Sequence, residues 1–305
     1  MRRPPGLPVA LSAKSESGCT GAASTEFSPP NDSASLRPNY VTADRLFRIA
    51  AEMSEQDWTL LSFVSAVRMA TGKQLGRRFW NAKREGDSAE ARAARRALAR
   101  LARHRVLDPL PRRIGGKRAG SSAIVFRVGV AGVKLLAKRG FQPRRLDAPG
   151  ALYVAHTLAC TELVVELHEA DQAGELECIE VQSEPTCWRG FLGPGAARLV
   201  LKPDLFVRVG AGSASEDRWM VETDLATEAS GTLRTKAARY LAHYRSGSEQ
   251  AEHSVYPRVL WAVPNEHRAG QVKDALRHLP DEATRLFTVR LLDEAVAFLA
   301  AEARS

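Results

Sequence analysis

The sequence predicts an α/β protein in two folded parts, the first built from helices with a β-hairpin and the second from a mixed β-sheet flanked by helices. Three observations lead to this prediction. Apolar residues recur at helical spacing early in the chain, short apolar runs alternate with helical segments later, and the net charge changes sign between the two parts. A chain of 305 residues is long enough for two such parts.

Composition excludes several classes of protein. Hydrophobic residues make up 44% of the chain and charged residues 26%, which is ordinary for globular proteins and excludes a wholly disordered or fibrous chain. No apolar run approaches the roughly 18–20 residues of a membrane-spanning helix, so we expect no membrane partner. The four cysteines lack CxxC spacing, which favours free thiols in a reducing compartment. We therefore expect a cytoplasmic protein.

Composition also divides the chain. Residues 1–40 are rich in Ser, Pro, Gly and Ala, and their apolar residues are too scattered to form a face, which predicts a disordered tail. A stretch with two prolines and a terminal glycine over 141–150 predicts a linker. The folded domains are then expected at 41–140 and 151–305.

The elements of the first domain follow in order. Ser54, with Asp57 three residues on, is typical of a helix start, and the apolar stripe after it runs to Met69. The further expected elements are helices over 72–80 and 89–105, two strands within 111–128 around a Gly-rich turn, and a helix over 130–138. Helices followed by a hairpin in this order predict a winged helix-turn-helix domain.

The first domain is strongly basic. Residues 41–150 hold 24 basic and 9 acidic side chains, a net charge of +15, whereas residues 151–305 have a net charge of −7. On the helix expected over 89–105, the arginines fall opposite the apolar residues. Guanidinium groups bind phosphate well, so we expect this domain to bind double-stranded DNA. The alternative is that the arginines form an ordinary solvated helix face. The candidate DNA-binding residues are Arg92, Arg96, Arg100, Arg103, Arg112, Arg113, Lys117 and Arg118.

The second domain alternates helices and strands, which predicts a mixed sheet with helices on its faces. A Gly-containing segment over 210–218 joins two of the strands and predicts a hairpin. The expected helices are 151–170, 231–244, 268–278 and 293–301, and the expected strands are 176–182, 199–209, 219–225, 257–263 and 286–291.

Three carboxylates fall on this expected hairpin. Alternation along the first strand puts Asp204 on the face opposite the apolar side chains, and Glu222 and Asp224 share one face of the second strand. Crowded carboxylates repel one another unless a cation lies among them. Lys236, on the next expected helix, would reach the same edge of the sheet. Alternatively, the acids pair with nearby arginines, for which Arg208, Arg234 and Arg239 are available.

The order Pro203-Asp204 and then Glu222-Thr223-Asp224 resembles the PD-(D/E)xK nuclease superfamily. In that superfamily a lysine usually stands two residues after the second acid. Asp224 stands there in this chain, and Lys236 on the following helix is the candidate for the lysine. Across residues 55–290, segments such as LKPDLFVRV, WMVETDLATEAS and YPRVLWAVP resemble the replication-relaxation family of actinobacterial plasmids and mobile elements.

The resemblance to the replication-relaxation family implies a role in plasmid replication and relaxation. Together with the resemblance to the nuclease superfamily, it implies that the protein is a Mg²⁺-dependent endonuclease that nicks plasmid or mobile-element DNA. Asp204, Glu222 and the Thr223 carbonyl would bind the ion, and Lys236 would stabilise the transition state. Asp224 would replace one ligand or support another. The alternative is a DNA-binding regulator or replication accessory factor whose nuclease-like domain does not cut. A homodimer is one possible assembly.

Overall fold

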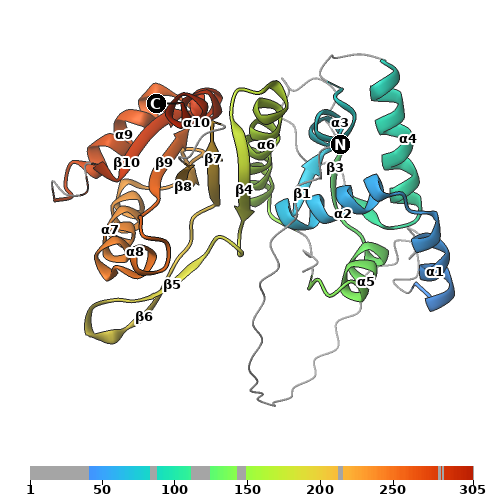
Figure 1. The fold of residues 1–305 in the computed structure, drawn as a ribbon, viewed down its shortest axis with the longest axis horizontal. Coiled ribbons are helices and arrows are strands. Elements are labelled where there is room, and N and C mark those ends of the chain that lie inside the picture. Colours follow the sequence, from blue (N-terminus) through green and yellow to red (C-terminus); the bar gives the residue numbers. More distant parts are fainter. Residues whose placement is uncertain are drawn as a thin grey trace, which may run out of the picture. The chain divides into compact units, whose positions relative to one another are not determined.

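Helices and a small sheet come first in the chain, and a larger mixed sheet follows (Figure 1). This computed structural model describes residues 41–82, 88–110, 124–142, 149–211, 216–280, 283 and 285–304. These residues belong to one compact unit, Val41–Ser305. The expected tail over 1–40, most of the Gly-rich hairpin and most of the expected linker lie outside the described residues.

The helices predicted for the first part are confirmed. Ser54 caps its helix as expected, and Asp57 completes a reciprocal capping box. That helix ends at Val67 rather than Met69, because Arg68 adopts a φ of 69° and Met69 begins a strand. The elements are α1 (Ala43–Glu52), α2 (Glu55–Val67), β1 (Met69–Thr71), α3 (Gly72–Trp80), α4 (Ala89–Arg103), β2 (Leu107–Pro109), β3 (Val125–Val128) and α5 (Val130–Lys138).

The small strands form an antiparallel sheet in the order β1-β3-β2. β2 and β3 flank residues 111–123. The second expected strand is confirmed at its end, where β3 lies, whereas β2 lies before residue 111, ahead of the range expected for the first strand. Neither α1 nor β1 was among the predicted elements.

The predicted mixed sheet is confirmed. Within the described residues it has five strands in the order β10-β9-β8-β7-β4, parallel from β10 to β8 and antiparallel from β8 to β4. The strands of the second part are β4 (Glu177–Ser183), β5 (Arg189–Leu192), β6 (Arg198–Leu201), β7 (Leu205–Gly210), β8 (Glu216–Thr223), β9 (Arg258–Val263) and β10 (Phe287–Leu291).

Helices cover both faces of this sheet, as expected. Alternate side chains of β7 and β8, such as Val207 and Val221, pack with residues of α6 and α10, whereas Phe206 and Met220 pack against Tyr240 of α7. On the second face, Trp261 and Val263 of β9 pack with residues of α7 and α9. The helices are α6 (Ala151–Ala173), α7 (Ser230–Ser246), α8 (Ser248–His253), α9 (Glu266–Leu276) and α10 (Ala295–Ala303).

The prediction of one continuous strand over 199–209 is wrong, because the chain forms two strands there, separated by Lys202-Pro203-Asp204. β6 ends at Leu201 and pairs with β5 in a separate two-stranded ribbon, while β7 begins at Leu205 in the large sheet. Pro203 has no N–H to donate, so a ladder is easily broken there. Asp204 consequently lies at the point where the chain enters the large sheet.

Helix α6 contacts both parts of the structure. The hydroxyl of Thr161 donates to the backbone oxygen of Met69, at 2.8 Å, and Gln74 donates to the backbone oxygen of Leu158, at 3.0 Å. Arg77 of α3 forms ion pairs with Glu162 and Glu169 of α6. The opposite side of α6 packs on the large sheet. Among the described residues, no helix combines the length and apolar character that crossing a membrane requires.

Candidate functional site

Asp204 and Glu222 lie across from each other at one end of the β7–β8 hairpin. The strand register pairs Leu205 with Val221, so Asp204 immediately precedes the pair on β7 and Glu222 immediately follows it on β8. The backbone N–H of Thr223 donates to Oδ2 of Asp204 at 2.7 Å, which joins the two strands at this point. The hairpin therefore brings the two acids expected to bind a metal to the same end of the sheet.

Glu222 is enclosed between β8 and α7. Its side chain is almost fully buried, with Nζ of Lys236 2.8 Å from Oε2, and the hydroxyl of Tyr240 donates to Oε1. Burial and the neighbouring charge of Asp204 together raise the pKa of Glu222, although the Lys236 ammonium opposes this shift. Burial acts to lower the pKa of Lys236, but the charges of Glu222 and Asp204 outweigh it and raise that pKa overall. The structure thus places Lys236 beside the acids, on the helix where it was expected.

Asp224 faces a different partner. Its Oδ2 is 2.7 Å from Nη2 and 2.9 Å from Nε of Arg268 on α9, and both side chains are buried. Its Oδ1 accepts from the backbone N–H of Ala226 at 2.7 Å. Asp224 is therefore neutralised by a guanidinium group and is not brought into the group formed by Asp204 and Glu222.

Two of the three arginines considered as alternative partners of these acids bind elsewhere in the described structure. Arg208 pairs with Glu180 and Glu216, and Arg239 donates to the backbone oxygen of Val200. Arg234 is exposed on α7. The guanidinium that does pair with one of the acids belongs to Arg268, which lies 44 residues beyond Asp224 in the sequence.

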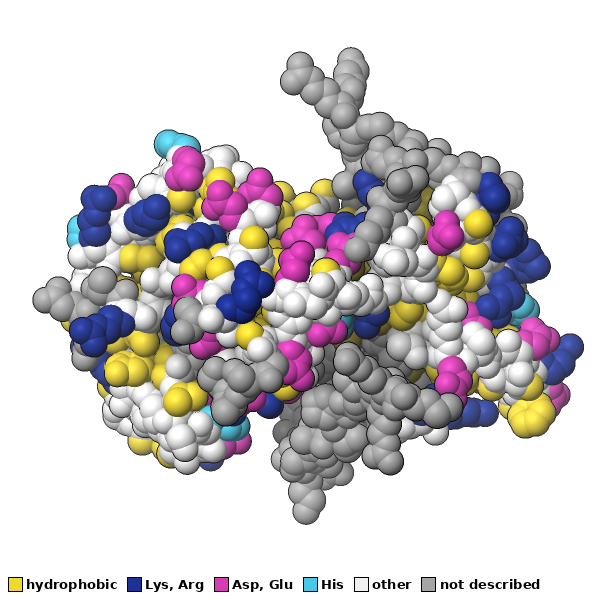
Figure 2. Space-filling model, turned by 45° about the horizontal axis from the view of Figure 1, so that its top comes forward, with side chains coloured by type: hydrophobic (Ala, Val, Ile, Leu, Met, Phe, Trp, Pro, Cys, Tyr) yellow, Lys and Arg dark blue, Asp and Glu magenta, His cyan; other side chains and the backbone are white. Residues whose placement is uncertain are grey.

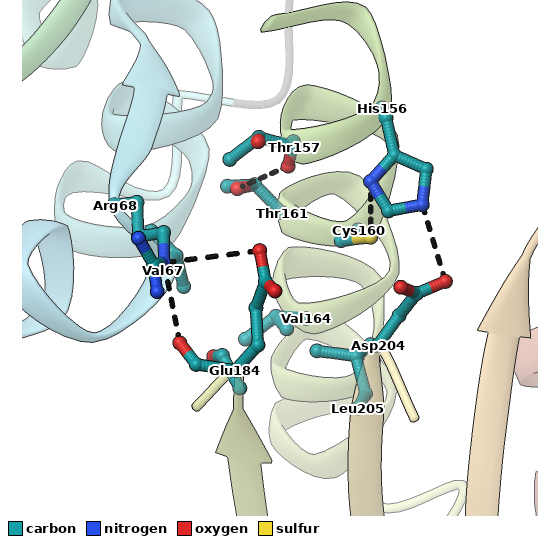
Figure 3. Close-up of a pocket in the computed structure, with 11 residues that line it drawn as sticks. Val67, Arg68, His156, Thr157, Cys160, Thr161, Val164, Glu184, Asp204 and Leu205 are labelled. Carbon is teal, nitrogen blue, oxygen red and sulfur yellow. Dashed lines mark hydrogen bonds and ion pairs between the residues drawn. The ribbon is translucent and has the colours of Figure 1, made fainter. Parts of the chain in front are cut away.

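His156 of α6 is a residue of this site that the sequence did not reveal. Its Nε2 lies 3.1 Å from Oδ2 of Asp204, and its Nδ1 lies 3.9 Å from Sγ of Cys160 (Figure 3). The hydrogen bonds to Asp204 and Cys160 raise the pKa of His156 to about 11, against the effect of burial. The signal that could have found it is the spacing of His156 and Cys160, four residues apart on one helix face.

These side chains line a pocket between α6, the end of α2, the end of β4 and the start of β7 (Figure 3). Arg68 and Glu184 lie across the pocket from His156, and Arg68 Nε bonds the backbone oxygen of Glu184 at 3.2 Å. The side chains of His156 and Asp204 are 32% and 13% exposed. The pocket therefore gives solvent access to Asp204.

The candidate DNA-binding arginines of α4 have different surroundings. Arg92, Arg96 and Arg103 are exposed, and Figure 2 shows Lys and Arg side chains gathered along the edge of the molecule at the right of the view. Arg100 instead points to the buried carboxylate of Asp57. Its Nη2 donates to Oδ1 at 2.7 Å and to Oδ2 at 2.8 Å. The remaining candidates, Arg112, Arg113, Lys117 and Arg118, lie outside the described residues.

Comparison with known proteins gives one match. A model of the replication-relaxation family matches residues 61–259, a span that runs from α2 to β9 and contains Asp204, Glu222 and Lys236. No curated protein and no solved structure matches the chain. Because the family match covers more than half of the sequence and includes both the helical part and the site, this chain belongs to the replication-relaxation family.

Proposed function

We propose that this protein binds double-stranded DNA of a plasmid or mobile element and nicks it in a Mg²⁺-dependent reaction. Membership of the replication-relaxation family supports a role in replication or relaxation. The observation that carries the nuclease proposal is that Asp204 and Glu222 lie at the same end of the β7–β8 hairpin and that Lys236 bonds Glu222. A lysine beside two acids on adjoining antiparallel strands is the arrangement that phosphodiester hydrolysis by a PD-(D/E)xK nuclease needs.

The arrangement of elements supports the same proposal. A helix, α6, precedes an antiparallel group of strands, and α7 then leads to β9, which is parallel to β8. This αβββαβ order is that of a PD-(D/E)xK-like domain. The helices α2 to α4 with the antiparallel β2 and β3 support a winged helix-turn-helix domain at the start of the described chain.

The donor set at the site fits Mg²⁺. The hydrogen bonds of Asp204 both use Oδ2, which leaves Oδ1 for a ligand, and carboxylate oxygens are the donors this ion prefers. Asp204, Glu222 and the Thr223 carbonyl would hold the ion. When bound, it would polarise the scissile phosphodiester and make the attacking water more acidic.

The protein's own residues set the geometry of the reaction. Tyr240 and Lys236 each bond one oxygen of Glu222, so the orientation of this carboxylate is fixed before substrate arrives. The Thr223 N–H fixes Asp204 in the same way. The Lys236 ammonium, held cationic by Glu222, Asp204 and Glu228, would stabilise the charge that develops on the phosphoryl oxygens. The exposed arginines of α4 would bind the DNA backbone.

Relaxation of supercoiled plasmid tests this proposal. Wild-type protein should convert supercoiled DNA to open circles with Mg²⁺ and not with EDTA, and Lys236→Met should be slower by about 10²–10³-fold because one preorganised charge is lost. Asp204→Asn should abolish nicking. A matched control is Asp217→Asn, because Asp217 lies at the opposite end of β8, where it pairs with Arg258. Nicking by Asp204→Asn at the wild-type rate would refute the assigned site.

A second function is favoured by one observation. Both oxygens of Glu222 already have protein partners, Lys236 and Tyr240, and Asp204 is bonded to His156. Carboxylates that already have protein partners suit a regulator or replication accessory factor, which would retain the nuclease-like fold only to bind DNA. Tight DNA binding by the wild-type protein, with no nicking at any Mg²⁺ concentration, would establish this second function and exclude the first.

A further inference from the structure

We propose that His156, Cys160 and Asp204 form a binding site for a thiophilic divalent metal ion, with Zn²⁺ as its representative. One ligand atom from each residue, a ring nitrogen, the thiol sulfur and a carboxylate oxygen, lies within 4.8 Å of the other two. The proposal is distinct from the Mg²⁺ site, because two of these three residues have no part in it.

The secondary structure explains why the three side chains meet. His156 and Cys160 are four residues apart on α6, so they project from the same face of the helix, one turn above the other. Asp204 reaches them from the loop between β6 and β7, where Pro203 ends one strand pairing and the chain turns into the large sheet. The position of Asp204 is fixed from its other side by the Thr223 N–H.

The spacing suits one small ion. Zinc binds nitrogen and oxygen at about 2.0–2.2 Å and sulfur at about 2.3 Å, so the ligand atoms of a tetrahedral site are about 3.3–3.8 Å apart. His156 and Asp204 are already 3.1 Å apart, and His156 and Cys160 are 3.9 Å apart. Small side-chain rotations would therefore bring one atom of each residue to a common ion, with the fourth position open to water from the pocket.

The chemistry of the donors selects the metal. Mg²⁺ takes oxygen ligands, whereas a thiolate with an imidazole and one carboxylate suits Zn²⁺ and similar ions. Arg68, which also lines the pocket, lies beside Glu184, with Nε 3.8 Å from Oε1, so the charge of this guanidinium is balanced locally. The cluster thus has the ligand types, the separation and the solvent access that a zinc site requires.

Sharing of Asp204 gives this site a consequence that rests on the proposed function. An ion held by His156 and Cys160 would occupy the carboxylate that Mg²⁺ needs, so Zn²⁺ would inhibit nicking. Binding itself does not depend on nicking and is measured without DNA. Zinc binding by a protein that does not nick would refute the nuclease proposal and leave the metal site standing.

The experiment is a metal titration of the full chain, purified without an affinity tag. Zn²⁺ affinity is measured by competition with a chromophoric chelator, and Co²⁺ serves as an optical probe, because a thiolate ligand gives it a charge-transfer band. We expect one Zn²⁺ per chain and a thiolate band with Co²⁺. Cys160→Ser and His156→Gln should each weaken Zn²⁺ binding by about 100-fold or more, since even the loss of a residue that only supports a ligand costs 10–100-fold.

The control is Cys178→Ser, which removes another half-buried thiol, on β4 and outside the cluster. This variant should bind Zn²⁺ as the wild type does. Equal affinity in Cys160→Ser and the wild type, or a Co²⁺ spectrum without the thiolate band, would overturn the proposal. If Cys160→Ser does not fold, as judged by circular dichroism, His156→Gln decides the question by the same two readouts.

Discussion

Replacing Arg268 by Met would leave the carboxylate of Asp224 buried without its cation. Two guanidinium nitrogens lie 2.7 and 2.9 Å from Oδ2 of Asp224, and the side chains of Arg268 and Asp224 are only 5% and 2% exposed. Arg268 also donates to the backbone oxygen of Glu228 at 2.8 Å, so that acceptor would lose its partner as well. The substitution thus tests whether Asp224 is part of the packing between β8 and α9.

The expected loss is large. Removing one partner of a buried ion pair costs about 3–5 kcal/mol, because the remaining charge stays in a medium that solvates it poorly. Methionine occupies much of the same space, so the cavity contribution is small. Adding Asp224→Asn to Arg268→Met should recover part of the lost stability, since it removes the uncompensated charge.

The free energy of unfolding in urea measures the effect, and the C-terminal end of the same helix, with its cap residue Arg277, offers a control. Arg277 pairs with Asp274 at 2.7 Å, but these side chains are 76% and 63% exposed. Arg277→Met should therefore change the free energy of unfolding by less than about 1 kcal/mol. An equally small change for Arg268→Met would refute the reasoning, and Asp224 would again be a candidate ligand beside Asp204.

The remaining predictions concern α4 and α6. Arg100→Ala should lower the free energy of unfolding in urea by about 1–3 kcal/mol, because the buried carboxylate of Asp57 loses its charged partner. Arg96→Ala should leave stability unchanged but reduce the slope of log Kobs for DNA against log salt by about 0.9, and an unchanged slope would place exposed Arg96 outside the interface. Burial, with the nearby charge of Glu162, raises the pKa of Glu166 to about 7. The stability that the protonated side chain of Glu166 contributes is therefore complete below its ordinary pKa of 4.5 and is lost as the pH rises towards 7. Glu166→Gln should flatten that part of the pH profile of unfolding, and a profile identical to the wild type would contradict this assignment.

The patterns that the sequence could reveal are local ones. Capping at Ser54 and alternation along β8 depend on neighbouring residues, so the helix start and the placement of Glu222 on the face towards α7 were predictable. The expectation that Asp204 faces away from the apolar side chains of its strand was wrong, because Asp204 bonds His156 of α6, the helix that packs on Leu205 and Val207. The break at Pro203 was missed because apolar residues alternate on both sides of it, in β6 and again in β7. Alternation cannot show that the two segments pair in different sheets.

The partners of the site residues are fixed by tertiary packing. Arg268 is 44 residues from Asp224, and His156 is 48 residues from Asp204, so no local spacing relates either pair. The same applies to Arg100 and Asp57, which are 43 residues apart. On the helical pattern alone, Arg100 was indistinguishable from exposed Arg96, although the structure gives it an internal partner.

Helix α6 has a consequence for exchanging segments among members of the family. A chimaera that replaced the helices before residue 151 would also replace Met69, Gln74 and Arg77, which bind α6 on the side away from the sheet. Glu162 and Glu169 would then need a new cation, and a displaced α6 would move His156 away from Asp204. Grafting a foreign DNA-recognition segment onto this protein therefore requires that the donor carry equivalents of Gln74 and Arg77 at the graft junction.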